Sequence, residues 1–198
     1  GPSEVMVLAD NSARAEFVAA DLLSQAEHGD DSQAILVCRT ERFARQVTRA
    51  VEEQIRYLSR GEAIRNSLAN SRIVLFDEEY KQIAFANAYA PEHLIVSMRD
   101  AWGIAAKITA AGSVFIGNYS PESAGDYASG TNHTLPTGVW ACACSGVNVD
   151  SFMRKITFQE LTRDGLDALA PAITAMAEAE GLDAHANAVR VRMKGGIL

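Results

Sequence analysis

Short, uniformly apolar runs alternate with longer segments of helical periodicity in residues 4–116, and this alternation most constrains the fold. The apolar runs are too short for surface helices, so they are expected to be strands. These strands cover residues 4–9, 34–38, 73–76, 94–97 and 113–116. Helices are expected between them, over residues 11–28, 43–61, 77–88 and 101–110.

Strands that alternate with helices are typical of a largely parallel sheet with helices on both faces. We therefore predict an α/β fold of Rossmann-like type, whose sheet is either complete or short of strands. Asn11 and Ser12 are expected to cap the first helix. Ligands of such folds bind beyond the carboxyl ends of the strands, so a site is expected at that edge.

The pattern changes after Val149. Two further helices are expected there, over residues 162–179 and 181–191, with no strand between them. We therefore predict an α/β domain over residues 1–147 and a separate helical tail over residues 148–198.

Composition limits the class of protein. The chain has 198 residues, 48% of them hydrophobic and 22% charged, with a net charge of −7. The negative charge argues against nucleic acid or an anionic membrane as a partner. No apolar run approaches the roughly 20 residues of a membrane span, and no secretory signal is visible. Three cysteines without disulfide-framework spacing suit a reduced, cytoplasmic setting.

The chain has only four histidines, which are His28, His93, His133 and His185. A histidine can bind a metal, act as a base or serve as an ordinary polar residue. Gln25 and His28 are three residues apart on the first helix and share a face. They could hold a metal or a ligand, or they could be the solvated end of a helix; glutamine is a poor zinc ligand.

Glu92 and His93 are adjacent at the entrance of the fourth expected strand, directly after Pro91. A carboxylate beside an imidazole could act as an acid/base pair on one reacting carbon. A surface turn would give the same spacing.

The long loop in residues 111–137 carries Asp126 and His133 among small residues. A connection of this length in a compact domain usually has a function. Ser120 and Pro121 are typical of a helix start, with the serine as N-cap and the proline in the first helical position. Asp126 would then face the loop as a ligand, or it would simply form a turn.

Glu180 and His185 lie between the two helices of the tail, where Gly181 is typical of a helix end. The sequence contains neither G-x-G-x-x-G nor G-x-x-x-x-G-K-[ST], so it shows no nucleotide-binding fingerprint.

Four blocks of sequence, taken together, match one family in order and spacing. They are FVAADLLSQAEH at residues 17–28, YAPEHL at 89–94, the loop at 120–137 and AEAEGLDAH at 177–185. The chain resembles the C-terminal part of histidinol dehydrogenase over nearly its whole length. The opening Gly-Pro-Ser-Glu is similar to a turn of the family, so it is expected to be native sequence.

The resemblance implies a site that combines these blocks. It implies zinc bound by Gln25, His28, Asp126 and His185. It implies that His93 takes the alcohol proton and that Glu92 activates water. It also implies a set of residues that contact the substrate, which are Ser3, Gln25, His28, His93, Asp126, His133, Glu180 and His185.

The family oxidises L-histidinol through the aldehyde to L-histidine with two NAD, in histidine biosynthesis. The resemblance implies a homodimer whose helical tail reaches the neighbouring subunit's site. Family members are about twice this length, and the absent N-terminal part would supply the NAD site. The activity of this chain alone is therefore open. The alternatives are a non-catalytic zinc- or imidazole-binding fragment and a family member that oxidises a different alcohol.

Overall fold

The computed structural model describes residues 2–193. The chain divides into two compact units, Gly1–Phe152 and Met153–Leu198. The first unit contains all five strands of the described chain, and the second contains two helices.

The first unit alternates strands and helices. Its strands are β1 (Glu4–Ala9), β2 (Gln33–Cys38), β3 (Arg72–Leu75), β4 (His93–Ser97) and β5 (Ser113–Ile116). Its α-helices are α1 (Ala15–Ala26), α2 (Glu41–Gln54), α3 (Gly61–Leu68), α4 (Glu79–Tyr89), α5 (Ala101–Ala105) and α6 (Glu122–Tyr127). Three 3-10 helices complete it, which are η1 (Ile55–Tyr57), η2 (Trp140–Cys142) and η3 (Val149–Phe152).

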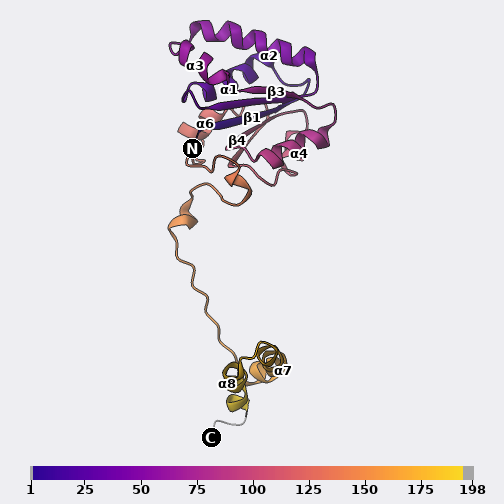
Figure 1. The fold of residues 1–198 in the computed structure, drawn as a ribbon, viewed down its shortest axis with the longest axis vertical. Coiled ribbons are helices and arrows are strands. Elements are labelled where there is room, and N and C mark those ends of the chain that lie inside the picture. The colour runs from indigo at the N-terminus through magenta and orange to yellow at the C-terminus, as the bar shows by residue number, and fades with distance from the viewer. Residues whose placement is uncertain (1, 194–198) are drawn as a thin grey trace. The chain divides into compact units, whose positions relative to one another are not determined.

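All five strands are parallel and lie in the order β3-β2-β1-β4-β5. In the central strand, Val5 pairs with Ala34 of β2 on one side and with His93 of β4 on the other. Helices α1, α2 and α3 cover one side of the sheet, and α4 lies on the other side (Figure 1). The predicted α/β fold with a parallel sheet is therefore confirmed.

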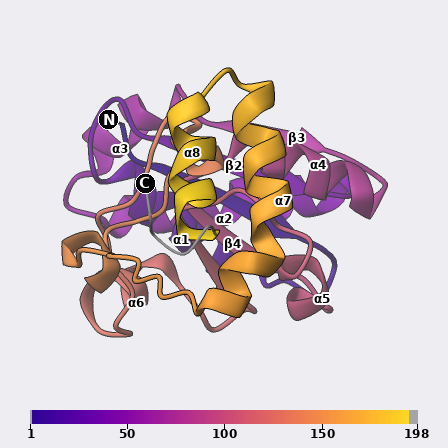
Figure 2. The ribbon, with the colours of Figure 1, turned by 90° about the horizontal axis from the view of Figure 1, so that it is seen from below.

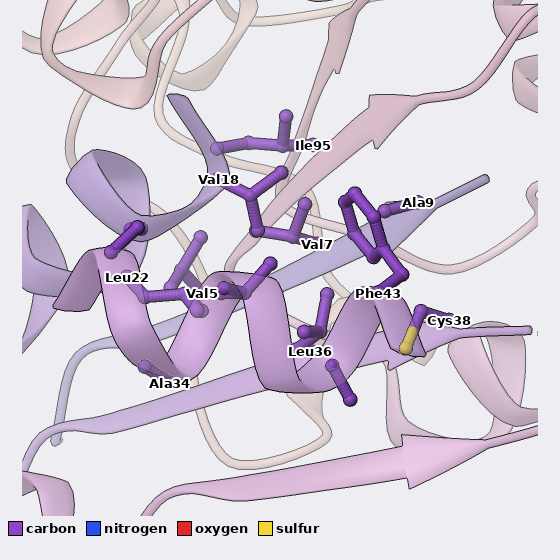
Figure 3. Packing of buried hydrophobic residues seen from close by; sticks show 14 of the residues in the cluster. Val5, Val7, Ala9, Val18, Leu22, Ala34, Leu36, Cys38, Phe43 and Ile95 are labelled. Carbon is purple, nitrogen blue, oxygen red and sulfur yellow. The ribbon is translucent and has the colours of Figure 1, made fainter. Parts of the chain in front are cut away.

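Strand β1 is buried along its whole length and divides the core into two layers. Val5, Val7 and Ala9 pack with residues of α1 and α2, as Figure 3 shows. Met6 and Leu8 point the other way and pack with residues of α4 and α5. Because side chains alternate across a strand, a strand that is apolar at every position must be covered on both faces.

Helix α1 begins later than the sequence suggests. The carboxylate of Asp10 accepts hydrogen bonds from the backbone N–H of Ser12 (2.8 Å) and from its hydroxyl. This turn uses the Ser12 side chain locally, so the predicted cap at Asn11 and Ser12 is wrong. The residue before the helix is Arg14, whose side chain makes no capping hydrogen bond.

Two other helices are shorter than predicted. The helix expected over residues 43–61 ends at Gln54, and a 3-10 turn separates it from α3. The helix expected over residues 101–110 ends at Ala105. Beyond it, the Asn87 amide donates to the Lys107 carbonyl (3.0 Å) and accepts from the Thr109 N–H (2.7 Å). These bonds replace helical ones.

The second unit is a pair of helices, α7 (Arg163–Ala179) and α8 (Asp183–Met193), which lie side by side (Figure 2). Thr162 caps α7 by accepting a hydrogen bond from the Gly165 N–H at 3.1 Å. Gly181, with a φ of +72°, forms the left-handed turn between the helices. None of the helices within residues 2–193 is both long and apolar enough to cross a membrane.

Candidate metal and catalytic site

The candidate residues of the first unit gather at the amino ends of the strands. Glu4 and His93 are the first residues of the neighbouring strands β1 and β4. Helix α1 returns from the carboxyl end of β1, so its last turn brings Gln25 and His28 back to this edge. The expectation of a site at the carboxyl edge is therefore wrong, because the polar residues come from strand starts and from helix ends.

His93 is held in one tautomer. Its ring is buried, and its Nδ1 lies 3.2 Å from the backbone carbonyl oxygen of Glu4. A carbonyl oxygen only accepts hydrogen bonds, so Nδ1 carries the proton and Nε2 has a free lone pair. Among the described residues, Nε2 has no hydrogen-bond partner, and the Oδ1 of Asp126 lies 3.9 Å away. Burial lowers the pKa of His93, which favours a neutral base.

Glu92 is fixed beside this base. Its Oε2 accepts a hydrogen bond from the Glu4 N–H at 3.0 Å and lies 3.7 Å from the Nδ1 of His93. Burial raises the pKa of the Glu92 carboxyl, while hydrogen bonds from the Glu4 N–H and the Ser3 hydroxyl lower it. A buried carboxyl next to an imidazole is suited to proton transfer.

The backbone before this pair has an unusual conformation. Ala90 ends α4 with a φ of 52°, in the left-handed region that glycine normally occupies. The next residues pair with the start of β5, where the Gly112 N–H donates to the Pro91 carbonyl and the Ser113 N–H donates to the Glu92 carbonyl, both at 2.9 Å. The turn directs both side chains of the pair into the protein rather than to the surface.

Helix α1 contributes Gln25 and His28 to this edge. Gln25 is fully buried, and neither of its amide atoms has a hydrogen-bond partner among the described residues. His28 follows the helix end, where its N–H donates to the Gln25 carbonyl at 3.2 Å. An unsatisfied buried amide costs about 1–3 kcal/mol, which indicates that it meets a group from outside this chain.

Helix α6 contributes two carboxylates, Glu122 and Asp126, which are one turn apart and share a face. Glu122 is 1% exposed, and neither of its oxygens has a hydrogen-bond partner within the described chain. Its Oε1 lies 3.8 Å from the Nε2 of His28 and 3.9 Å from the Nδ1 of His93. Burial, with a smaller contribution from Asp126, raises the pKa of Glu122 to about 8.

The start of α6 differs from the prediction by one residue. The Ser120 hydroxyl donates to the Ile116 carbonyl at 2.8 Å and does not cap the helix. The N-cap position is held by Pro121, so the helix begins at Glu122. Glu122 is thus the first residue of the helix, one turn before Asp126.

These side chains fit a divalent metal. One ligand atom each of His28, Glu122 and Asp126 lies within 4.8 Å of the other two. Two ligands at about 2.0–2.2 Å from one zinc ion are at most about 4.4 Å apart, and the 3.8 Å between His28 and Glu122 lies within that limit. Imidazole nitrogen and carboxylate oxygen are ordinary zinc ligands, and a cation would offset the buried carboxylates.

The remaining predicted residues are His133 and Ser3 of the first unit and two residues of the second unit. His133 is exposed in the loop after α6, and within residues 2–193 no hydrogen bond or ion pair connects it to the residues above. Glu180 follows the last residue of α7, and His185 lies in the first turn of α8. Both are exposed on the helical tail. Ser3 contacts Glu92 through its hydroxyl.

Three acidic residues at this edge were missed from the sequence. Glu4 interrupts an otherwise apolar strand, which was the available signal, and Glu122 precedes Asp126 by one helical turn. Asp21 precedes Gln25 by one turn, and its negative charge contributes to the raised pKa of Glu122. Burial raises the pKa of Asp21 itself to about 7. The edge therefore concentrates more carboxylates than one chain can keep ionised without a cation.

Comparison with known proteins gives the family of this chain. The histidinol dehydrogenase family model matches residues 1–193. Histidinol dehydrogenase of Bacteroides fragilis (strain YCH46) is 58% identical over 194 residues, and that of Legionella pneumophila (strain Lens) is 50% identical over 193 residues. Each match covers 98% of this chain and 45% of the relative.

A solved structure gives the same result for the fold. The crystal structure of histidinol dehydrogenase from Elizabethkingia anophelis matches with a TM-score of 0.93 and 55% identity, over 98% of this chain and 45% of that one. The chain thus spans a little under half the length of the relatives it matches. It belongs to the histidinol dehydrogenase family.

Proposed function

We propose that this chain is the zinc- and substrate-binding part of an enzyme that oxidises L-histidinol through the aldehyde to L-histidine with two NAD. The observation that carries this proposal is the state of His93. Its Nδ1 is tied to the Glu4 carbonyl, and its free Nε2 lies beside Asp126 in a buried cluster. A neutral, oriented imidazole is the group that alcohol oxidation needs as a base.

Zinc is proposed to be held by Gln25, His28, Asp126 and His185. The unpartnered buried amide of Gln25 supports the first, and the ligand atoms of His28 and Asp126, which lie within 4.8 Å of each other, support the next two. When bound, zinc supplies a Lewis acid that orients the imidazole and amino nitrogens of the substrate. His185 comes from the tail, and its part in the set rests on the resemblance.

The proposed chemistry uses the two neighbouring groups in turn. His93 Nε2 accepts the hydroxyl proton while a hydride leaves the carbinol carbon for the first NAD, which gives the aldehyde and NADH. Glu92 then accepts a proton from the water that adds to the aldehyde. The resulting hydrate loses a second hydride to the second NAD, and the carboxylic acid forms. Burial raises the pKa of Glu92 towards neutral pH and lowers the pKa of His93, which keeps the imidazole neutral and able to accept a proton.

The remaining contacts follow from the resemblance. Ser3, His133 and Glu180 are proposed to contact the substrate, together with the zinc ligands and His93. We propose that the protein is a homodimer in which the tail of each protomer reaches the site of its partner. NAD is proposed to bind outside this chain, whose sequence lacks a dinucleotide fingerprint. A cytoplasmic location is proposed on the three free cysteines. The net charge of −7 is the reason to propose no nucleic-acid or anionic-membrane partner.

The test joins this chain to the N-terminal part of the Bacteroides fragilis relative, and this protein is called the full-length chimera below. With zinc, NAD and L-histidinol, it is expected to form two NADH for each histidinol consumed. Formation of histidine is followed by chromatography. A chimera that binds zinc and histidinol and forms no NADH would support the alternative of a non-catalytic zinc- or imidazole-binding fragment. A chimera that prefers another alcohol would support the alternative of a family member with a different substrate.

A further inference from the structure

Glu122 is a buried side chain at this edge to which neither the proposed chemistry nor the proposed zinc set gives a role. It is 1% exposed, and both of its oxygens are buried without a hydrogen-bond partner in the described chain. A buried carboxyl group with no partner for either oxygen is unfavourable in both protonation states, so a purely structural role does not account for it. The side chain needs a donor from outside the chain.

The nearby histidines do not supply that donor. The distance of 3.8 Å from Glu122 Oε1 to His28 Nε2 exceeds the usual length of a hydrogen bond. The distance of 3.9 Å to His93 Nδ1 is also too long, and that nitrogen already faces the Glu4 carbonyl. Glu122 therefore borders the site without being used by it.

The position of Glu122 is specific. Its Oε1 lies within 4 Å of His28 Nε2, which belongs to a proposed zinc ligand, and of Nδ1 on the ring of His93, whose other nitrogen is the proposed base. In a 2-amino alcohol, the amine and the hydroxyl stand on adjacent carbons. A group that receives the amine must therefore lie close to both the metal and the ring of His93. Glu122 and Asp126 both do, and Asp126 is already a proposed zinc ligand.

We propose that Glu122 accepts a hydrogen bond from the amino group of the substrate and so selects amino alcohols over simple alcohols. This inference rests on the proposed function and deepens it. The residues proposed to hold zinc are Gln25, His28, Asp126 and His185, so Glu122 is outside that set. An amine that binds a metal through its lone pair keeps two N–H donors, and an ionised carboxylate only accepts.

The test compares two ligands on two variants. Binding of L-histidinol and of its deamino analogue, 3-(imidazol-4-yl)propan-1-ol, is measured by calorimetry on the zinc-loaded 198-residue chain. The variant is Glu122→Gln, which keeps the shape of the side chain and removes its charge. The control is Glu53→Gln, an exposed change on α2. Zinc content and the thermal midpoint are measured for each protein.

Glu122→Gln is expected to weaken histidinol binding by about 10- to 100-fold, the effect of losing a charged hydrogen bond. Binding of the deamino analogue and zinc content should stay as in the wild type. Equal loss for both ligands, or loss of zinc, would overturn the inference and make Glu122 a metal ligand or a structural residue. Unchanged histidinol binding would also overturn it. A wild-type chain that binds neither compound would instead refute the proposed function, and the inference with it.

Discussion

The Nδ1 of His93 lies 3.2 Å from the backbone carbonyl oxygen of Glu4, across the join between strands β4 and β1. The backbone N–H of Glu4 donates to the carboxylate of Glu92 at 3.0 Å. One strand start thus fixes both members of the proposed acid/base pair. Because these are backbone groups of a buried parallel sheet, the pair is oriented before any ligand binds.

Replacing His93 separates catalysis from metal binding. In the full-length chimera, His93→Ala is expected to lower the rate of histidinol oxidation by about 10²- to 10⁴-fold, the contribution of a general base. Its zinc content should be that of the wild type, because His93 is outside the proposed ligand set. The zinc content and the rate of NADH formation are measured for the variant and for the wild type. Loss of zinc in this variant would refute the role given to His93.

Replacing His28 or Asp126 should, in contrast, remove the bound zinc. Each change removes a proposed ligand, so zinc is expected to be lost from His28→Ala and from Asp126→Ala. The matched control is His133→Ala, which removes an exposed imidazole from the loop after α6 and should keep zinc. The zinc content of each protein is measured after dialysis. Full zinc content in either ligand variant would rule out the proposed metal site.

Gly112 is expected to tolerate no side chain. A Cβ at this position would lie 2.5 Å from the backbone carbonyl oxygen of Glu92 and 3.1 Å from the Cβ of Leu135. Gly112→Ala should therefore destabilise the chain by about 1–3 kcal/mol, as overpacking does. It should also reduce activity in the chimera, since the turn that carries Glu92 must move.

The control for this change is Gly29→Ala, whose Cβ would meet only the movable carboxylate of Asp31 at 3.2 Å. Denaturant unfolding compares the two variants. Equal free energies of unfolding for the two proteins would contradict this prediction and show that the backbone at Glu92 can move to make room for a Cβ.

Asp21 should make stability depend on pH. Burial raises its pKa in the folded chain to about 7, from an ordinary aspartate value of 3.8. The folded state therefore binds the proton more tightly than the unfolded state, and the stabilisation present below pH 4 is lost as the pH rises through 7. Asp21→Asn should remove this loss in the zinc-free chain.

The thermal midpoint of Asp21→Asn should exceed that of the wild type at pH 8, by about 2–4 °C for each kcal/mol gained. At pH 4 the two proteins should differ little. The same difference at both pH values would mean that the carboxyl is not held protonated by burial.

A mixed dimer tests whether the tail completes the partner's site. Two tagged chains, one with His28→Ala and the other with His185→Ala, are coexpressed and purified through both tags. If the tail is exchanged, one site of each mixed dimer carries both changes and the other carries neither, so about one zinc per dimer is expected. If the tail serves its own protomer, both sites are damaged and zinc is absent.

The sequence predicted the sheet well because the signal was local. The runs that became β1 and β5 have the predicted bounds, and the others differ by about one residue. Uniformly apolar segments of four to six residues have few other solutions than buried parallel strands. The helix ends were less accurate, because side chains distant in sequence decide them. Asn87 redirects the backbone after α5, and no pattern within residues 101–110 shows this.

The site was predicted only in part from the residues themselves. Spacing placed Gln25 with His28 and Glu92 with His93, but each pair also fitted a surface segment. The expected carboxyl edge was wrong because the general rule describes ligands that bind to loops after strands. Glu4 and Glu122 were missed because a single carboxylate in a strand or helix looks like ordinary surface polarity until its burial is known.

Zinc binding by the 198-residue chain, measured with and without L-histidinol, tests the proposed function most directly. About one zinc per chain is expected, held more tightly when histidinol is present, because the substrate nitrogens share the metal with Gln25, His28 and Asp126. A folded chain that binds no zinc, or whose zinc affinity does not respond to histidinol, would contradict the proposed site.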